Sequence, residues 1–90
     1  MSLFNPPHPG LMVKDLMIED EDGIKINSVA HAAEQLGCHR STLNSLISTR
    51  RSLTPEMAIA LETNGLGSAE HWLAMQASYD LFALRNNQVA

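Results

Sequence analysis

The chain has 90 residues, of which 44% are hydrophobic, and its formal net charge is −4. This length supports one domain with a single core, and the apolar share excludes a disordered polypeptide. No apolar run approaches the roughly 20 residues that span a bilayer, and no signal-peptide pattern opens the chain. The one cysteine, Cys38, excludes an internal disulfide and is typical of a protein in the reducing cytoplasm.

The charges are unevenly distributed. Acidic side chains are concentrated early, at Asp15 and from Glu19 to Asp22, whereas residues 35–55 contain none. This acid-free segment holds three of the six Lys and Arg residues, namely Arg40, Arg50 and Arg51. A negative total argues mildly against a nucleic-acid partner, but the distribution matters more than the sum. The alternative is that these arginines only form a solvated face.

In chain order, residues 1–8 are predicted to form an extended lead-in, because their prolines disfavour a helix. Pro9 suits the first turn of a helix, where its missing N–H would be unpaired anyway. Apolar residues then recur at helical spacing and predict a first helix from about Pro9 to Glu19. The acidic stretch ending at Gly23 is predicted to be a loop, and it lacks the ligand spacing of a calcium loop.

Asn27 or Ser28 can cap a second helix, which Gly37 ends because glycine adopts a left-handed backbone without strain. Its inner face is predicted to comprise Val29, Ala30, Ala33 and Leu36. A third helix is predicted to begin near Cys38 or His39. Its inward residues are predicted to be Leu43, Leu46 and Ile47.

Thr54-Pro55-Glu56 predicts the start of a fourth helix, since it supplies a cap, a first-turn proline and an acid at the positive end of the dipole. Its buried side is predicted to be Met57, Ala58 and Leu61, and Asn64-Gly65 to end it. Ser68 caps a fifth helix, predicted over residues 68–85. Because no strand alternation occurs, the expected fold is an all-α domain of five helices.

Residues 29–48 have the layout of a helix-turn-helix. A small residue, Ala33, stands where the two helices must approach, Gly37 lies in the turn, and Leu43 and Leu46 can fix the second helix to the core. The polar residues that face outward from that second helix are Arg40, Ser41, Asn44, Ser45 and Ser48.

Arginine can bond bidentately to guanine and asparagine to adenine, so this strip is predicted to read DNA bases. Thr49, Arg50 and Arg51 follow at the helix end, where we expect them to contact phosphates. The alternative is a solvated helix surface without a ligand.

No pattern indicates catalysis or metal binding. The four histidines, His8, His31, His39 and His71, show no metal-ligand spacing on one helix, and no catalytic constellation or phosphate-binding glycine loop is present. Cys38 is predicted to be a small packed residue of the turn. We therefore expect a protein without enzymatic activity, metal or cofactor.

The fifth predicted helix has two apolar sides. One comprises Trp72, Met75, Tyr79 and Phe82, and the other, roughly opposite, comprises Leu73, Ala77, Leu81 and Leu84. Because an outer helix of a small bundle buries one face only, the second side predicts a homodimer interface. The alternative is that Leu81 and Leu84 are merely exposed at a fraying end of the helix. A twofold dimer would set two reading helices about 34 Å apart, on successive turns of a palindromic site.

Three strings of residues are recognisable as a set. They are Pro6-Pro7-His8-Pro9-Gly10, Arg50-Arg51-Ser52-Leu53-Thr54-Pro55-Glu56-Met57-Ala58 and His71-Trp72-Leu73-Ala74-Met75-Gln76-Ala77-Ser78-Tyr79-Asp80-Leu81. Together they resemble the HigA family, which comprises antitoxins of bacterial toxin–antitoxin modules built on a repressor-like helix-turn-helix. The similarity extends from Asn5 to about Arg85.

The resemblance implies a five-helix fold, a homodimer and two binding tasks. One is repression of the antitoxin's own operon at a palindromic operator in double-stranded DNA. The other is neutralisation of a HigB-type toxin, in this family usually a ribosome-dependent endoribonuclease that cleaves translated mRNA. Many relatives have Asn-Gly where this chain has Ser48-Thr49. We therefore expect a longer or reshaped helix end and a displaced Arg50-Arg51 pair.

Two alternatives remain on the sequence. A small phage-type repressor would share the fold and act without a toxin. A protein-interaction module would keep the fold without binding DNA, a reading favoured by the negative net charge and the missing glycine.

Overall fold

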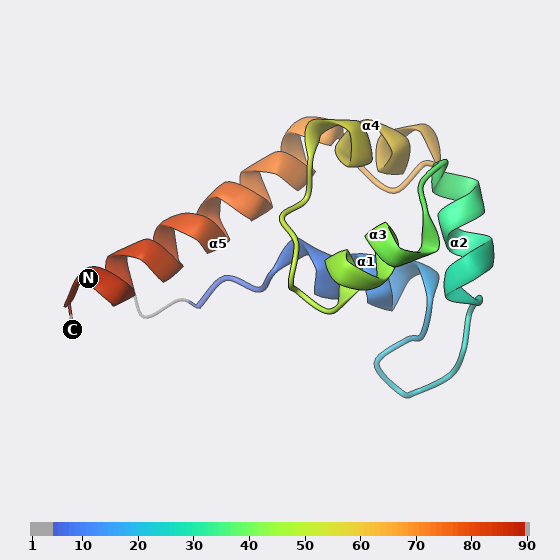
Figure 1. The fold of residues 1–90 in the computed structure, drawn as a ribbon, viewed down its shortest axis with the longest axis horizontal. Helices are drawn as coiled ribbons and strands as arrows, with labels where there is room; N and C mark the ends of the chain where they lie inside the picture. The colour runs from blue at the N-terminus through green and yellow to red at the C-terminus, as the bar shows by residue number, and fades with distance from the viewer. Residues whose placement is uncertain (1–4, 90) are drawn as a thin grey trace.

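The computed structural model describes residues 5–89, with side chains described up to residue 87. It contains five helices: α1 Pro9–Met17, α2 Val29–Leu36, α3 Arg40–Ile47, α4 Pro55–Thr63 and α5 Ala69–Val89 (Figure 1). Apart from one isolated bridge between Glu19 and Lys25, the regular structure of the described residues is helical. The all-α, five-helix prediction is therefore confirmed. The lead-in can be followed from Asn5, since residues 1–4 lie outside the described part of the chain.

Side-chain caps fix where the helices begin. Ser28, rather than Asn27, caps α2, because its hydroxyl accepts the His31 backbone N–H at 3.1 Å. Thr54 caps α4 in the same way, through the backbone N–H of Met57 at 3.3 Å. Both caps satisfy donors that would otherwise be unpaired at a helix start.

The third helix lies at the centre of the fold. It packs against α1 and α2, while α4 packs against α5 (Figure 1). The largest fully buried side chains come from every helix except α2: Trp72, Leu43, Leu46, Leu61, Val13 and Pro9. Among the described residues, no helix has the length and apolar character needed to cross a membrane.

One predicted core residue of α2 was wrong. Ala30 is exposed, and Ala32 is fully buried in its place. The buried face is centred on Ala32, Ala33 and Leu36, with Val29 half-buried, which is the i, i+3, i+4, i+7 spacing of one helix face. Ala30 stands about 100° away from Val29 and points to solvent.

The last helix is longer than predicted. It continues to Val89, because residues 86–89 include no glycine or proline to end it. Its second half extends away from the other four helices (Figure 1). Leu81 and Leu84 in that half are 47% and 56% exposed.

Candidate nucleic-acid interface

The turn between α2 and α3 has the geometry that a helix-turn-helix requires. Gly37 is left-handed at φ 69°, and its N–H donates to the Glu34 carbonyl at 3.2 Å. The Cys38 N–H donates to the Ala33 carbonyl at 3.0 Å. These two bonds form a Schellman motif that ends α2 and turns the chain into α3.

The predicted reading strip lies on one face of α3. At 100° per residue its five polar side chains span roughly 140° of the helix surface, opposite Leu43 and Leu46, which are 0% and 1% exposed. Four of the five are exposed and Ser45, at the edge of the arc, is half-buried. The structure therefore brings together Arg40, Ser41, Asn44, Ser45 and Ser48.

The exit from α3 keeps a tight turn without glycine. The Thr49 N–H donates to the Leu46 carbonyl at 3.0 Å and the Arg50 N–H to the Ser45 carbonyl at 2.9 Å, which is again a Schellman pattern. Thr49 takes the left-handed position at φ 62°, the one non-glycine residue of the described chain to do so. A left-handed backbone costs an L-residue roughly 1–2 kcal/mol. The missing glycine thus appears as local strain at Thr49.

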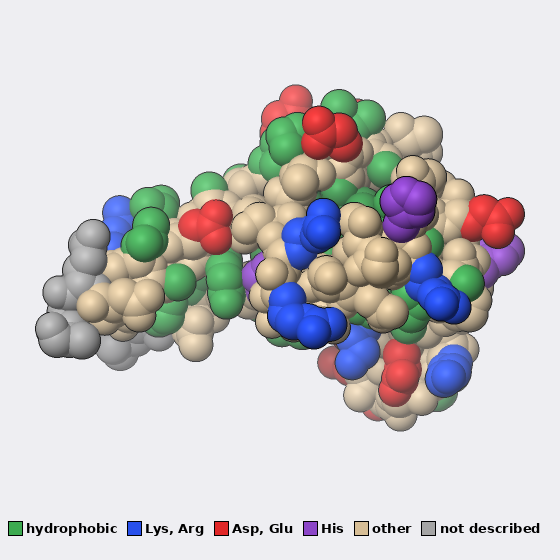
Figure 2. Space-filling view, in the orientation of Figure 1, with side chains coloured by type: hydrophobic (Ala, Val, Ile, Leu, Met, Phe, Trp, Pro, Cys, Tyr) green, Lys and Arg blue, Asp and Glu red, His purple; other side chains and the backbone are tan. Residues whose placement is uncertain are grey.

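Arg50 and Arg51 are exposed on the segment that follows this turn. Figure 2 shows Lys and Arg side chains on the face over α3 and its neighbouring segments, with acidic side chains at the margins of that face, over α4 and over the loop after α1. The exposed residues of the acid-free interval therefore contribute to a polar and cationic face.

Two buried polar residues that the sequence analysis did not single out hold this segment. Gln76 of α5 is 6% exposed, and its Oε1 accepts the Leu53 N–H at 2.8 Å. Its Nε2 donates to Oδ1 of Asp80 at 2.9 Å. The string that contains Gln76 was noted only for its resemblance, and no local pattern indicates a partner 23 residues away.

His8 is the second buried polar residue, at 4% exposure. Its Nδ1 accepts the Gly10 N–H at 2.9 Å and so caps α1, and its ring meets Tyr79 edge-on with centroids 4.8 Å apart. Burial lowers the pKa of His8, and the charge of Asp80 and the backbone of Arg51 partly oppose that shift. The ring is therefore held neutral, with Nδ1 as acceptor. Its place directly before Pro9 was the signal for a cap.

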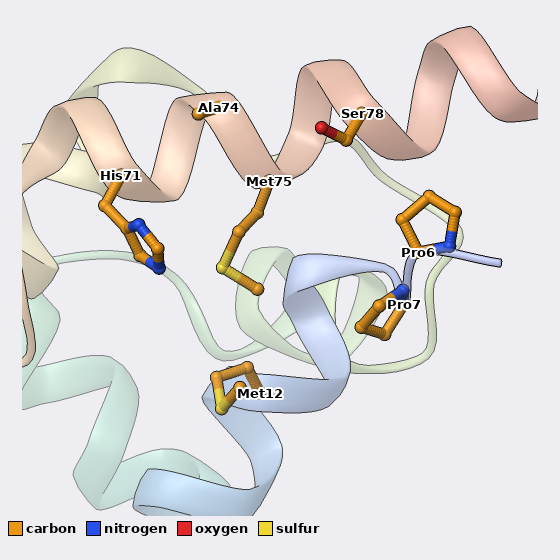
Figure 3. Close-up of a pocket in the computed structure, with 7 residues that line it drawn as sticks. All are labelled: Pro6, Pro7, Met12, His71, Ala74, Met75 and Ser78. Atoms are coloured by element: carbon orange, nitrogen blue, oxygen red, sulfur yellow. The ribbon is translucent and has the colours of Figure 1, made fainter. Parts of the chain in front are cut away.

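A groove runs between the start of α1 and α5. It is lined by Pro6, Pro7, Met12, His71, Ala74, Met75 and Ser78 (Figure 3). The lining is largely apolar and has one ionisable side chain, which suits packing rather than acid–base chemistry. Cys38, in the turn before α3, is half-buried, and burial raises the pKa of its thiol. A raised pKa keeps the thiol protonated and unreactive.

The predicted dimer residues share one side of α5, away from buried Trp72. Leu73 is half-buried, whereas Ala77, Leu81 and Leu84 are exposed. The exposed part of this side lies towards the half of α5 that extends beyond the core.

No family model matches the chain. Virulence-associated protein A' of Dichelobacter nodosus is 42% identical over 78 residues, which are 86% of this chain and 64% of that protein. The chain thus spans slightly less than two thirds of that relative. Virulence-associated protein A of the same organism is 40% identical over 86% of this chain and 72% of its own length. The uncharacterised HTH-type transcriptional regulator YbaQ of Escherichia coli K12 is 37% identical over 91% of this chain and 69% of its own length.

Solved structures share the fold over almost the whole chain. A proposed antidote protein of a plasmid maintenance system from Nostoc punctiforme has a TM-score of 0.77 at 31% identity, over 94% of this chain and 89% of that one. Pseudomonas aeruginosa antitoxin HigA, solved with the higBA promoter, has a TM-score of 0.73 at 29% identity, over 93% and 90%. With this sequence identity, fold and coverage, the chain belongs to the HigA family of helix-turn-helix proteins, whose members are antitoxins and transcriptional regulators without enzymatic activity.

Proposed function

We propose that the chain is an antitoxin that represses its own operon in the cytoplasm by binding a palindromic operator as a homodimer, and that it neutralises an mRNA-cleaving toxin. DNA binding is supported by the compact polar strip of α3, which two exposed arginines follow at once. Residues 35–55, which contain both, include no acidic side chain. The relative solved with the higBA promoter supports the same reading.

Two kinds of contact are assigned to this face. Arg40, Asn44 and the serines of the strip read base edges in the major groove. Arg50 and Arg51, with Thr49, contact phosphates, because they lie beyond the end of the reading helix. The first set determines which operator is bound, and the second contributes affinity that depends on salt.

Binding to the chain's own promoter, measured as a salt series, tests this assignment. Arg50→Ala is expected to reduce the slope of log K against log[salt], the salt slope, by about one unit. Each phosphate contact contributes about 0.9 to that slope. Arg40→Ala is expected to cost roughly 1–3 kcal/mol at particular base pairs. Arg85→Ala, an exposed arginine of α5, is the matched control and should change neither quantity. Equal binding to all sequences by the unaltered chain would refute the proposal.

The homodimer is assigned to the exposed apolar side of α5, at Leu73, Ala77, Leu81 and Leu84. An α3 strip with a single cationic base-reading residue, Arg40, binds weakly by itself. Two copies on successive groove turns multiply that affinity, so dimerisation is part of the mechanism.

The toxin partner rests on the antitoxins among the chain's relatives. Co-expression with the product of the neighbouring gene tests it: relief of toxicity and co-purification are expected of a HigB-type toxin. The relatives named as HTH-type regulators favour a second candidate, a repressor without a toxin. Operator binding without any effect on the neighbouring gene product would select that candidate.

A further inference from the structure

The segment between α3 and α4 carries the two arginines, but Ser52 and Leu53, which follow them, make no helical hydrogen bond. Fixing the backbone of each free residue costs about 1–2 kcal/mol. Unless something holds this segment beforehand, DNA binding must supply that cost, and affinity falls accordingly.

Gln76 holds the far end of the segment. Its Oε1 accepts the N–H of Leu53, which immediately follows Arg51 and Ser52, at 2.8 Å. Asp80 accepts from the same amide group at 2.9 Å and so fixes which side of the amide faces Leu53. Leu53 itself is 4% exposed, so water has little access to this residue as a replacement partner for its N–H.

The start of α1 holds the near end. Gly10 lies against the backbone carbonyl of Leu46, which accepts the Thr49 N–H. His8, which caps the start of α1 through the Gly10 N–H, has its ring in contact with Tyr79 of α5. Figure 3 shows Pro6 and Pro7 alongside this stretch of α5, near Met75 and Ser78. The arginine segment is thus held from α5 and from α1.

We propose that Gln76 is a positioning residue for operator DNA: it fixes the backbone that carries Arg50 and Arg51 and touches no DNA itself. This inference rests on the proposed DNA-binding function. It assigns a role in binding to a side chain that is buried on α5, a helix outside the reading head.

Gln76→Met tests the proposal, because methionine has a similar length and no oxygen acceptor. We expect a folded protein whose operator affinity is about tenfold lower, which corresponds to fixing roughly one further residue on binding. The salt slope should fall towards that of the Arg50→Ala/Arg51→Ala double variant, by up to about two units. In that double-variant background, Gln76→Met should change operator affinity by less than about twofold, because the two arginines that Gln76 positions have been removed.

Gln76→Glu combined with Asp80→Asn is the rescue variant. A carboxylate oxygen then accepts from Leu53, the asparagine amide donates to the other oxygen, and the net charge is unchanged. It should restore the salt slope. Gln35→Met is the control: it makes the same exchange at an exposed position of α2, where the lost bond is one from the Asn27 side chain at 3.2 Å, and it should leave the salt slope unchanged. Asp80→Ala, at an exposed position, removes the orienting acceptor and, with it, one negative charge close to His8. It serves as the second test if Gln76→Met does not fold, and it should give a smaller loss of affinity in the same direction.

An unchanged salt slope in folded Gln76→Met or Asp80→Ala would overturn the proposal. A loss that remains as large in the Arg50→Ala/Arg51→Ala background would do the same, since Gln76 would then act on the whole fold. Circular dichroism and sedimentation under the assay conditions report fold and assembly in every variant. Failure of the unaltered chain to bind its promoter is a different outcome, which refutes the proposed function itself.

Discussion

Gly10 of α1 lies so close to the backbone of Leu46 in α3 that a Cβ atom at residue 10 would overlap the Leu46 carbonyl oxygen. The obstacle is backbone rather than a flexible side chain, so the two helices must separate to accept any larger residue. The glycine of the Pro6–Gly10 string is therefore required by close packing beneath the reading helix. Its backbone is helical, so conformational freedom is not the reason.

We expect Gly10→Ala to lower the free energy of unfolding by roughly 1–3 kcal/mol or more, the usual cost of overpacking. Urea denaturation monitored by circular dichroism measures it. Gly65→Ala is the comparison, since nothing lies within 4 Å of a Cβ there and only its positive φ of 77° opposes the change. A smaller loss for Gly10→Ala than for Gly65→Ala would contradict the packing argument.

Thr49→Gly is expected to stabilise the fold. It relieves a left-handed backbone that costs an L-residue about 1–2 kcal/mol, against a lesser entropic cost of glycine in the unfolded chain. A net gain of about 0.5–1 kcal/mol should appear as a higher melting temperature. Ser48→Gly, one residue earlier at φ −89°, relieves nothing and should not stabilise. Equal gains from both variants would show that residue 49 is unstrained.

The stability of the fold should decrease on mild acidification because of His8. Its pKa is lowered from the ordinary 6.5 by burial, so the unfolded chain takes up a proton at a higher pH than the folded one. The free energy of unfolding is therefore unaffected by His8 above about pH 6.5. It declines as the pH falls from 6.5 towards the lowered pKa, by at most about 1.4 kcal/mol per pH unit. Protonation at Nδ1 would also remove the acceptor that caps α1.

Urea unfolding at several pH values between 7.5 and 5 measures this decline. In His8→Asn the amide oxygen can still cap the helix but does not titrate, so the pH dependence should flatten. His39→Asn, at an exposed position, should leave it unchanged. If the free energy of unfolding changed with pH in the same way in all three proteins, its pH dependence would come from groups other than His8.

Leu84→Glu is expected to dissociate the proposed dimer. Because a twofold interface contains each residue twice, burial of the two leucines contributes roughly 2–4 kcal/mol. Sedimentation should show a monomer, and operator binding should weaken along with it. Asn86→Glu places the same charge at an exposed position on the opposite side of α5, and it should stay dimeric. A Leu84→Glu protein that remains a dimer would place the interface elsewhere.

Much of the fold was predictable because its signals are local. Thr54 and Pro55 mark a helix start, Gly37 marks a helix end, and Leu43 and Leu46 repeat at helical spacing. The polar strip of α3 follows from the same periodicity. Ala30 was misassigned although the helical spacing of Val29, Ala33 and Leu36 already places Ala32, and not Ala30, on their face.

The buried polar contacts were not predictable because they join distant parts of the chain. Gln76 reaches Leu53 across 23 residues, and His8 meets Tyr79 across the whole fold. Likewise, the sequence shows that glycine is absent at residue 49. It does not show whether the chain would avoid the left-handed turn or adopt it under strain, because surrounding hydrogen bonds determine that outcome.

The separation between the buried contacts of Gln76 and His8 and the outward side chains of α3 has a consequence for protein engineering. Several residues of the strings that make the chain recognisable as a family member are buried, among them His8, Trp72 and Gln76, whereas Arg40, Ser41 and Asn44 are exposed on α3. The outer surface of α3 can therefore be exchanged between relatives as an independent module. Such grafts should transfer operator preference while the host scaffold keeps its melting temperature.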